Sequence, residues 1–245
     1  MKIAANGAIR GLVGNLVARK IGNQQIIQSR PRKFKQTVAT KEASTDFGRA
    51  SKFGGFIRAC LSDTHLDLYD SRMVSRLNGQ ILRTMRANPD QIRGRMCLQQ
   101  GKLNRLANFQ FNEKSNTQDY LNFDVELSLN EKNLLAIDIP RFKKDRDIKF
   151  HDAAEKMVIV INAMAIDIAN ADVKIVSYTE IEIDCLTLDG WREAERIAID
   201  CNAFKGSAIF VGLSMLYLNN SRGRDILLNS KELHPASIVG AFNIT

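Results

Sequence analysis

The chain has 245 residues, 44% of them hydrophobic and 25% charged, which is typical of a globular protein rather than a disordered one. Residues 1–115 hold 21 Lys and Arg against 7 Asp and Glu, and residues 116–245 hold 14 against 20, giving net charges of +14 and −6. A strongly basic region indicates an anionic partner, either nucleic acid or an acidic protein surface.

Several classes of protein are excluded by what the sequence lacks. No window approaches the ~20 apolar residues of a membrane span, and the N-terminus has no signal-peptide core. We therefore expect a cytoplasmic protein, released only by a dedicated export system or by cell lysis. The four cysteines are far apart, without a C-x-x-C pair, so we expect free and mostly buried thiols: Cys60, Cys97, Cys185 and Cys201.

The first 31 residues favour extended structure, because glycine recurs at positions 7, 11, 14 and 22. Leu12–Ile21 and Gln24–Ser29 are β-compatible runs, and the Gly22-Asn23 pair between them suits the type II′ turn of a hairpin. One face would carry Val17, Arg19, Ile21 and Ile26, and the other Leu16, Ala18, Lys20 and Ile27. Neither face is cleanly apolar, and an isolated hairpin is marginal in water, so this one needs a partner.

Two to three helices are expected next. After the basic run Arg30–Lys35, apolar residues recur every three or four positions: Ala43, Phe47, Ala50, Phe53, Ile57 and Leu61. Gly54-Gly55 weakens this helix near its end. A second helix begins near Asp70-Ser71 and places on one face Met73, Leu77, Ile81 and Met85. Proline suits a first helical turn, so Pro89 opens the third candidate, with the apolar residues Ile92, Met96, Leu103 and Leu106.

From about Leu121 the apolar period changes from helical to alternating. The expected strands are Phe123–Leu129, Leu134–Ile139, Met157–Ile168, Val173–Cys185, Glu195–Phe204, Ala208–Leu218 and Ser237–Ile244. Seven short strands indicate an antiparallel, immunoglobulin-like β-sandwich. The predicted fold is therefore α+β, with a basic hairpin-plus-helices region at 1–118 and an acidic sandwich at 119–245. Trp191 falls in a loop, where it plugs the sandwich or faces a partner.

No catalytic constellation is recognisable. His65, His151 and His234 fall in three predicted surface loops, without a second ligand or an orienting group. The glycines form no phosphate-binding loop, and a nucleophile elbow is missing. We therefore expect no catalytic, cofactor-binding or metal-ligating residues and no cofactor. An enzyme or small-ligand module with a pocket between the two regions is the remaining rival.

Charged side chains form two candidate partner surfaces. Glu180, Glu182 and Asp184 alternate along a predicted strand and so lie on one face, either as a solvated acidic stripe or as the counterpart of the basic region. The tract Arg30–Lys41, with Arg49, Lys52 and Arg58, could neutralise several phosphates. The helical pattern assigns Phe47 and Phe53 to the core, however, so a base-stacking platform is weakly supported.

The opening also resembles a known family. The matching segments are Asn6–Val17, Gly22–Ile27, Gln28-Ser29-Arg30-Pro31 and the basic run through Gln36 and Thr37. Over roughly the first 60 residues they resemble an uncharacterised family from Bacteroidota, whose members open with a glycine-punctuated G-x-V-G hairpin, a basic Arg-x-x-Pro exit and a helix. The resemblance implies a C-terminal β-sandwich and no known activity.

These observations predict a non-enzymatic structural subunit that assembles with copies of itself into a filament, tube or shell. The expected assembly residues are Val13, Leu16, Val17, Arg19, Ile21, Ile26, Ile27, Arg30, Arg32, Lys33, Lys35, Glu180, Glu182 and Asp184. The alternative is a nucleic-acid-binding or phage-like packaging or virion protein that contacts phosphate through its basic region.

Overall fold

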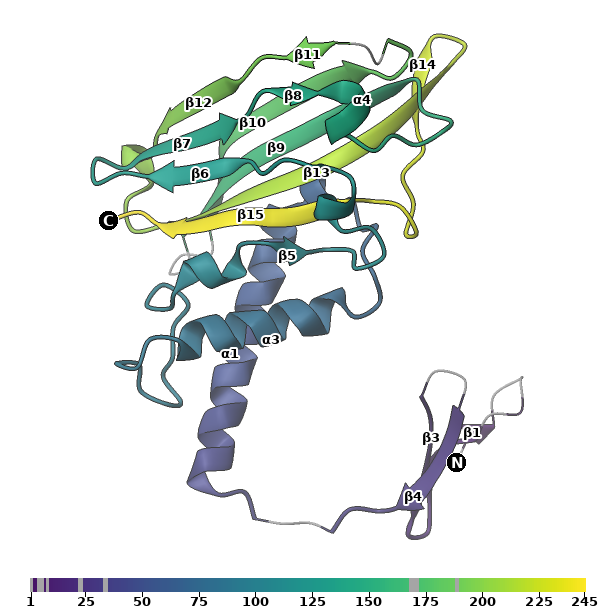
Figure 1. The fold of residues 1–245 in the computed structure, drawn as a ribbon. Coiled ribbons are helices and arrows are strands. Elements are labelled where there is room, and N and C mark those ends of the chain that lie inside the picture. The colour runs from purple at the N-terminus through teal and green to yellow at the C-terminus, as the bar shows by residue number, and fades with distance from the viewer. Residues whose placement is uncertain are drawn as a thin grey trace. The chain divides into compact units, whose positions relative to one another are not determined.

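A computed structural model describes residues 2–3, 7, 9–21, 24–32, 35–167, 172–187 and 190–245. These residues divide into two compact units, Met1–Lys41 and Glu42–Thr245. Helices and antiparallel strands both contribute, so the α+β class is confirmed (Figure 1).

The N-terminal unit is a four-stranded antiparallel sheet in the order β1-β2-β3-β4. Its strands are β1 (Lys2–Ile3), β2 (Ile9–Val13), β3 (Leu16–Ile21) and β4 (Gln24–Ser29). The expected hairpin is confirmed, because β3 pairs with β4 from Leu16 opposite Ser29 to Ile21 opposite Gln24. Its turn, Gly22-Asn23, lies outside the described residues.

The expected single strand Leu12–Ile21 is instead two strands joined by a tight turn. Val13 pairs with Leu16 across this turn, and Gly14 has a φ of +55°. Glycine adopts this left-handed conformation without the strain that a Cβ atom brings. A two-residue turn between paired strands therefore forms at Gly14-Asn15.

The helical elements of the second unit lie mostly before residue 120. They are α1 (Val38–Cys60), α2 (Ser62–His65), α3 (Met73–Arg86), α4 (Lys144–Asp147) and the 3-10 turns η1 (Leu103–Leu106), η2 (Thr117–Asp119) and η3 (Asn202–Phe204). The predicted second helix is confirmed, and all four of its predicted core residues are fully buried in α3.

The apolar face predicted for α1 is wrong at one position. Phe47 is 52% exposed, whereas Asp46, Ala50, Gly54 and Ile57 are buried. Gly54 explains the difference, because a Cβ atom there would meet the side chains of Asn78 and Ile81 in α3. The glycine is a helix–helix contact rather than a weak point of the helix.

The predicted third helix is wrong apart from the short turn η1. Residues 87–102 form turns held by side chains: Gln91 Nε2 donates to Met85 O at 2.8 Å, and Asn88 Nδ2 donates to Gln100 O at 2.9 Å. Gly94 has a φ of +81°, which a regular right-handed helix does not allow.

The largest sheet has six strands in the order β10-β9-β13-β15-β5, with β14 also paired to β13. Its members are β5 (Phe109–Gln110), β9 (Lys156–Asp167), β10 (Asp172–Asp184), β13 (Ala208–Ser221), β14 (Arg224–Leu227) and β15 (Ala236–Asn243). A three-stranded sheet, β12-β7-β6, and a two-stranded sheet, β11-β8, complete the unit. Their strands are β6 (Glu126–Leu129), β7 (Leu134–Ile139), β8 (Phe142–Lys143), β11 (Trp191–Arg192) and β12 (Glu195–Asp200).

Both faces of the six-stranded sheet are covered at its central strands, β9, β13 and β15. On one face, Ile159, Ile161 and Val211 share a core with Leu135 and Ile137 of β7. On the other face, residues of β9, β13 and β15 share a second core with α1 and α3, as Figure 1 shows. The second unit is therefore built of three layers: helices, the large sheet and the smaller sheets.

The helices from residue 42 onward thus share a core with the sheet. The expected regions, 1–118 and 119–245, do not coincide with the two compact units, which divide after Lys41. The two sheets around one core agree with a sandwich, and the immunoglobulin-like assignment stays a prediction.

Candidate assembly surface

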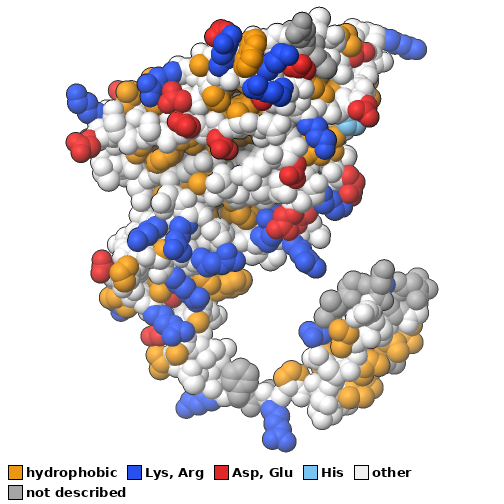
Figure 2. All heavy atoms as spheres, viewed as in Figure 1, with side chains coloured by type: hydrophobic (Ala, Val, Ile, Leu, Met, Phe, Trp, Pro, Cys, Tyr) orange, Lys and Arg blue, Asp and Glu red, His pale blue; other side chains and the backbone are white. Residues whose placement is uncertain are grey.

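One face of the N-terminal sheet is apolar and exposed. Side chains directly opposite each other on paired strands share a face, so Val13 and Leu16 lie together, and Ala18 lies with Ile27. Val13, Leu16 and Ile27 are 46%, 48% and 57% exposed, whereas Ala18 is buried. These four residues are called the apolar patch below, and Figure 2 shows hydrophobic side chains gathered on this unit.

The opposite face of the same sheet mixes apolar and polar side chains. Val17 lies opposite Gln28, and Arg19 lies opposite Ile26. Arg19 Nη2 donates to Gln28 Oε1 at 3.1 Å. The predicted division of side chains between the two faces is therefore confirmed for these residues, while the side chain of Ile21 lies outside the described residues.

A basic segment follows the sheet. Arg30, Arg32 and Lys35 are exposed, and Lys33 lies outside the described residues. Arg30 N donates to Asn15 O at 2.6 Å, which fixes the beginning of the segment against the β2–β3 turn. Pro31 follows. Because proline has no backbone N–H, it cannot donate the hydrogen bond that would continue β4.

The acidic stripe, Glu180, Glu182 and Asp184, lies on β10 as predicted. All three side chains are exposed, and the intervening Ile181 and Ile183 are buried. These side chains lie on the helix side of the sheet. Glu180 and Glu182 are opposite Val160 and Val158 of β9, whereas the core shared with β7 contains the alternate residues of β9, such as Ile159 and Ile161. β10 is also the outer strand of the six-stranded sheet.

Local hydrogen bonds reach two of the three carboxylates of the acidic stripe. The hydroxyl of Thr187 and the backbone N–H of Leu186 donate to Asp184, at 2.7 and 2.8 Å, and lower the pKa of its carboxyl group. Tyr178 donates to Glu180 Oε1 at 2.9 Å. Partial burial, followed by this contact, raises the pKa of Tyr178 to about 12.

Two of the three histidines are in the core, which corrects the prediction of surface loops. His234 Nε2 donates to Thr64 O at 2.9 Å, and its Nδ1 accepts from Asn229 Nδ2 at 2.9 Å. His65 Nε2 donates to Arg58 O, and its Nδ1 accepts from Asp67 N, both at 3.0 Å. Since a carbonyl oxygen only accepts, both rings are neutral with both nitrogens bonded, and burial lowers both pKa values.

Trp191 is in β11 rather than in a loop and is 46% exposed. The guanidinium groups of Arg141 and Arg146 lie 4.6 and 5.3 Å from its ring centroid. Trp191 therefore does not plug the sandwich, and cation–π contacts fix its ring at the surface.

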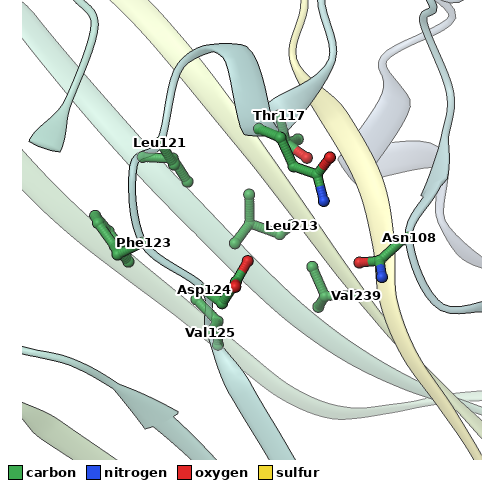
Figure 3. Close-up of a pocket in the computed structure, with 9 residues that line it drawn as sticks. Asn108, Thr117, Leu121, Phe123, Asp124, Val125, Leu213 and Val239 are labelled. Atoms are coloured by element: carbon green, nitrogen blue, oxygen red, sulfur yellow. The ribbon is translucent and has the colours of Figure 1, made fainter.

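A pocket of about 280 Å³ lies between the large sheet and the chain before β6. Leu213 and Val239 come from β13 and β15, and Leu121, Phe123, Asp124 and Val125 come from the chain before β6 (Figure 3). Asp124 is the one ionisable group among the described lining residues. Asp124 is exposed, and the described lining residues include no histidine or second carboxylate that could act with it in acid–base catalysis.

Within the described ranges, no group of three or more His, Cys, Asp or Glu side chains is placed to hold a metal ion. None of the described helices is long and apolar enough to cross a membrane. The four cysteines are free of disulfides, with Cys60 and Cys201 buried.

Comparison with known proteins finds no relative. No protein-family model matches the chain, and no curated protein or solved structure is significantly similar to it. The resemblance of the first 60 residues to a Bacteroidota family therefore gains no support from these comparisons.

Proposed function

We propose that this chain is a non-enzymatic structural subunit that self-assembles into a filament, tube or shell through its N-terminal sheet and basic segment. The observation that supports the proposal is the exposed apolar patch, since Ala18 is the one hydrophobic side chain buried among the described residues of that unit. Small sheets need a covered apolar face for stability, and exposed apolar patches mark interaction sites.

The apolar patch alone gives a modest driving force. Fully burying a Val, Leu or Ile side chain contributes about 1.5–3 kcal/mol, so covering three half-exposed side chains adds roughly 3 kcal/mol. Association costs more than this in lost translational and rotational freedom. A stable assembly therefore needs further contacts, which the strand edges and the charges can supply.

A second copy of the chain is the partner that fits best. β4 and β10 are both edge strands, and an edge strand presents unpaired N–H and C=O groups to which another strand can add. Arg30, Arg32 and Lys35 complement Glu180, Glu182 and Asp184 in charge, which would steer the encounter. Contact between unlike surfaces of identical subunits produces rings or open helical polymers.

Size-exclusion chromatography and negative-stain microscopy test the proposal directly. We expect the full chain to form large, regular particles and a version beginning at Gln36 to remain monomeric, because the second unit keeps both of its cores. If both versions run as monomers at high micromolar concentration, the proposal fails.

A single substitution tests the apolar patch with the whole chain present. Ile27→Asp places a charge in the patch and should abolish the particles, because burying an unpaired carboxylate is costly. Ile226→Asp is the matched control, since Ile226 is 50% exposed against 57% for Ile27 but lies on β14. Equal loss of assembly in both variants would contradict a role for the patch.

Nucleic-acid binding through the basic segment is the second candidate, and the exposure of Arg30, Arg32 and Lys35 favours it. Phosphate contacts would give a steep dependence of affinity on salt, which filter binding across a salt series measures. An immunoglobulin-like sandwich and a cytoplasmic setting complete the proposal, and the unpaired thiols suit a reducing compartment.

A further inference from the structure

The outer side of the helical layer carries a dense group of cations that the assembly proposal does not use. Seven Lys and Arg side chains are exposed between positions 72 and 105, and none forms an ion pair with a described residue: Arg72, Arg83, Arg86, Arg93, Arg95, Lys102 and Arg105. They are called the helical basic face below. Figure 2 shows Lys and Arg side chains gathered over this layer.

In the sheet region of the same unit, many cations form ion pairs. Carboxylates pair with Lys114, Arg141, Arg146, Lys156, Arg192 and Arg196. Eight of the fifteen Lys and Arg residues from position 114 onward form an ion pair, whereas none of the seven cations of the helical basic face does so with a described residue. A concentration of unpaired positive charge raises the local electrostatic potential and attracts polyanions.

Helix geometry aligns part of this charge in one row. With 3.6 residues per turn, Arg72, Gly79, Arg83 and Arg86 fall within a stripe about 60° wide. The stripe is opposite the buried side of α3. Gly79 lies among these cations, and the guanidinium of Arg83 lies beside it, because a Cβ atom at Gly79 would be 3.7 Å from Arg83 Nη2.

The segment after α3 adds cations in fixed positions. Gln80 joins the two parts, because its Oε1 accepts from Arg83 Nη1 at 2.5 Å and its Nε2 donates to Arg105 O at 2.6 Å. Lys102 N donates to Thr84 O at 3.2 Å. The backbone beside Lys102 and Arg105 is therefore held against α3, so binding there does not require a tail to become ordered.

The buried carboxylate of Asp46 holds the backbone that carries Arg93 and Arg95. Arg93 and Arg95 flank Gly94, whose N–H donates to Asp46 Oδ2 at 2.8 Å, and Met96 N donates to Asp46 Oδ1 at 3.2 Å. Asp46 is fully buried in α1. Both oxygens of Asp46 thus accept from the backbone of this segment, and the side chain of Glu42 also lies against Gly94.

The composition of the face fits phosphate better than protein. Six of the seven cations are arginine, whose planar guanidinium matches phosphate oxygens in a bidentate way. Ile92 is the one large hydrophobic side chain exposed between positions 70 and 107. Protein interfaces have an apolar core with few charges, which this face does not offer. We infer that the helical basic face binds the phosphate backbone of nucleic acid without reading its sequence.

Fluorescence anisotropy with a labelled DNA duplex, the full chain and a salt series tests the inference. The test variant combines Arg83→Gln, Arg86→Gln, Lys102→Gln and Arg105→Gln. The matched control removes four charges from the sheets: Lys114→Gln, Arg141→Gln, Arg146→Gln and Arg196→Gln. Since each phosphate contact adds about 0.9 to the slope of log K against log[salt], the test variant should lower the slope by about 3 to 4, and the control should keep the parent slope.

Several results would overturn the inference. They are no binding by the parent chain, an equal loss in both variants, or a loss reproduced in full by Arg30→Gln with Arg32→Gln and Lys35→Gln. A change in particle size without a change in anisotropy would assign the face to an acidic protein surface instead, which also overturns it. If the test variant does not fold, as circular dichroism reports, Arg93→Gln with Arg95→Gln replaces it, with an expected decrease in slope of about 2.

Discussion

The two buried histidines make the stability of the fold depend on pH. The pKa values of His65 and His234 are lowered by burial, whereas both side chains take up a proton near pH 6.5 in the unfolded chain. Below that pH the unfolded state therefore binds more protons than the folded state. The free energy of unfolding is highest above pH 6.5 and decreases as the pH falls toward the folded-state pKa values.

Urea unfolding between pH 7.5 and 5.5 measures this effect while most carboxyl groups stay ionised. His234→Gln should lower the free energy of unfolding by about 1–2 kcal/mol at pH 7.5, because two buried hydrogen bonds are disturbed. It should also reduce the further loss at pH 5.5. His151→Gln is the control, since His151 is only partly buried. An unchanged pH dependence in His234→Gln would show that other groups cause the loss.

Gly212 of β13 lies at a close approach between the sheet and α2. A Cβ atom there would meet Thr64 Oγ1 and Asn162 Oδ1, which form a buried hydrogen bond of 2.7 Å. Gly212→Ala should therefore lower the free energy of unfolding by about 1–3 kcal/mol. Gly48→Ala, in an open position on α1, should raise it by about 0.5–1 kcal/mol. A thermal melt of both variants that shows the same sign would contradict this account.

The burial of a residue could be predicted where it depends on residues nearby in the sequence. Glu180 and Glu182 are exposed because strand alternation alone places them opposite Ile181 and Ile183. His234 is buried because it bonds to Thr64, 170 positions away in the chain. A contact over that separation leaves no periodic signal in the sequence, so a surface loop was the natural and incorrect prediction.

At the scale of elements, long alternating strands were predictable and short ones were not. The bounds of β7, β9, β10, β13 and β15 agree with the expected strands to within a few residues. The two-residue strands β5, β8 and β11 are too short for an alternation to be recognised. The four-residue β14 carries exposed side chains throughout, so it has no apolar face to reveal it.

The edge strand β10 offers a test of the charge pairing proposed for assembly. Glu180→Lys with Glu182→Lys should slow assembly and weaken its dependence on salt, because steering by opposite charges is lost. Glu126→Lys with Glu131→Lys makes the same charge change at exposed positions elsewhere. Light scattering during assembly compares the rates. Equal rates in the two variants would remove the acidic stripe from the proposal.

At the scale of the whole molecule, the central strands join two cores into one folding unit. Ile161 and Val211 belong to the core between the sheets, and Ile166 and Phe210 belong to the core under the helices, although both pairs come from β9 and β13. Loss of packing in one core therefore displaces β9 and β13, whose other faces form part of the second core. We expect residues 42–245 to unfold in a single cooperative transition.

Two probes can check this cooperativity. Trp191 is the single tryptophan of the chain and reports on the smaller sheets, while circular dichroism at helical wavelengths reports on α1 and α3. Urea midpoints from the two probes should coincide in a version beginning at Gln36. Separate midpoints would show that the helices and the sheets unfold independently.

The division of the chain was the least predictable feature. The change from helical to alternating periodicity near Leu121 indicates a change of element type, and it predicts a boundary near residue 118. Ala50 and Ile57 of α1 nevertheless share a core with Phe210 and Ile238 of the sheet. Periodicity reveals which face of an element is apolar, but it does not reveal which other element covers that face.

Arg32 and Lys35, between β4 and α1, also determine how the purified protein responds to traces of protease. Arg32 and Lys35 stand in irregular, exposed chain, where proteases cut most readily. A trace of trypsin would thus remove the apolar patch and spare both cores. Such a sample would keep its circular dichroism spectrum and its melting temperature. It would gradually lose any activity that depends on the first 35 residues.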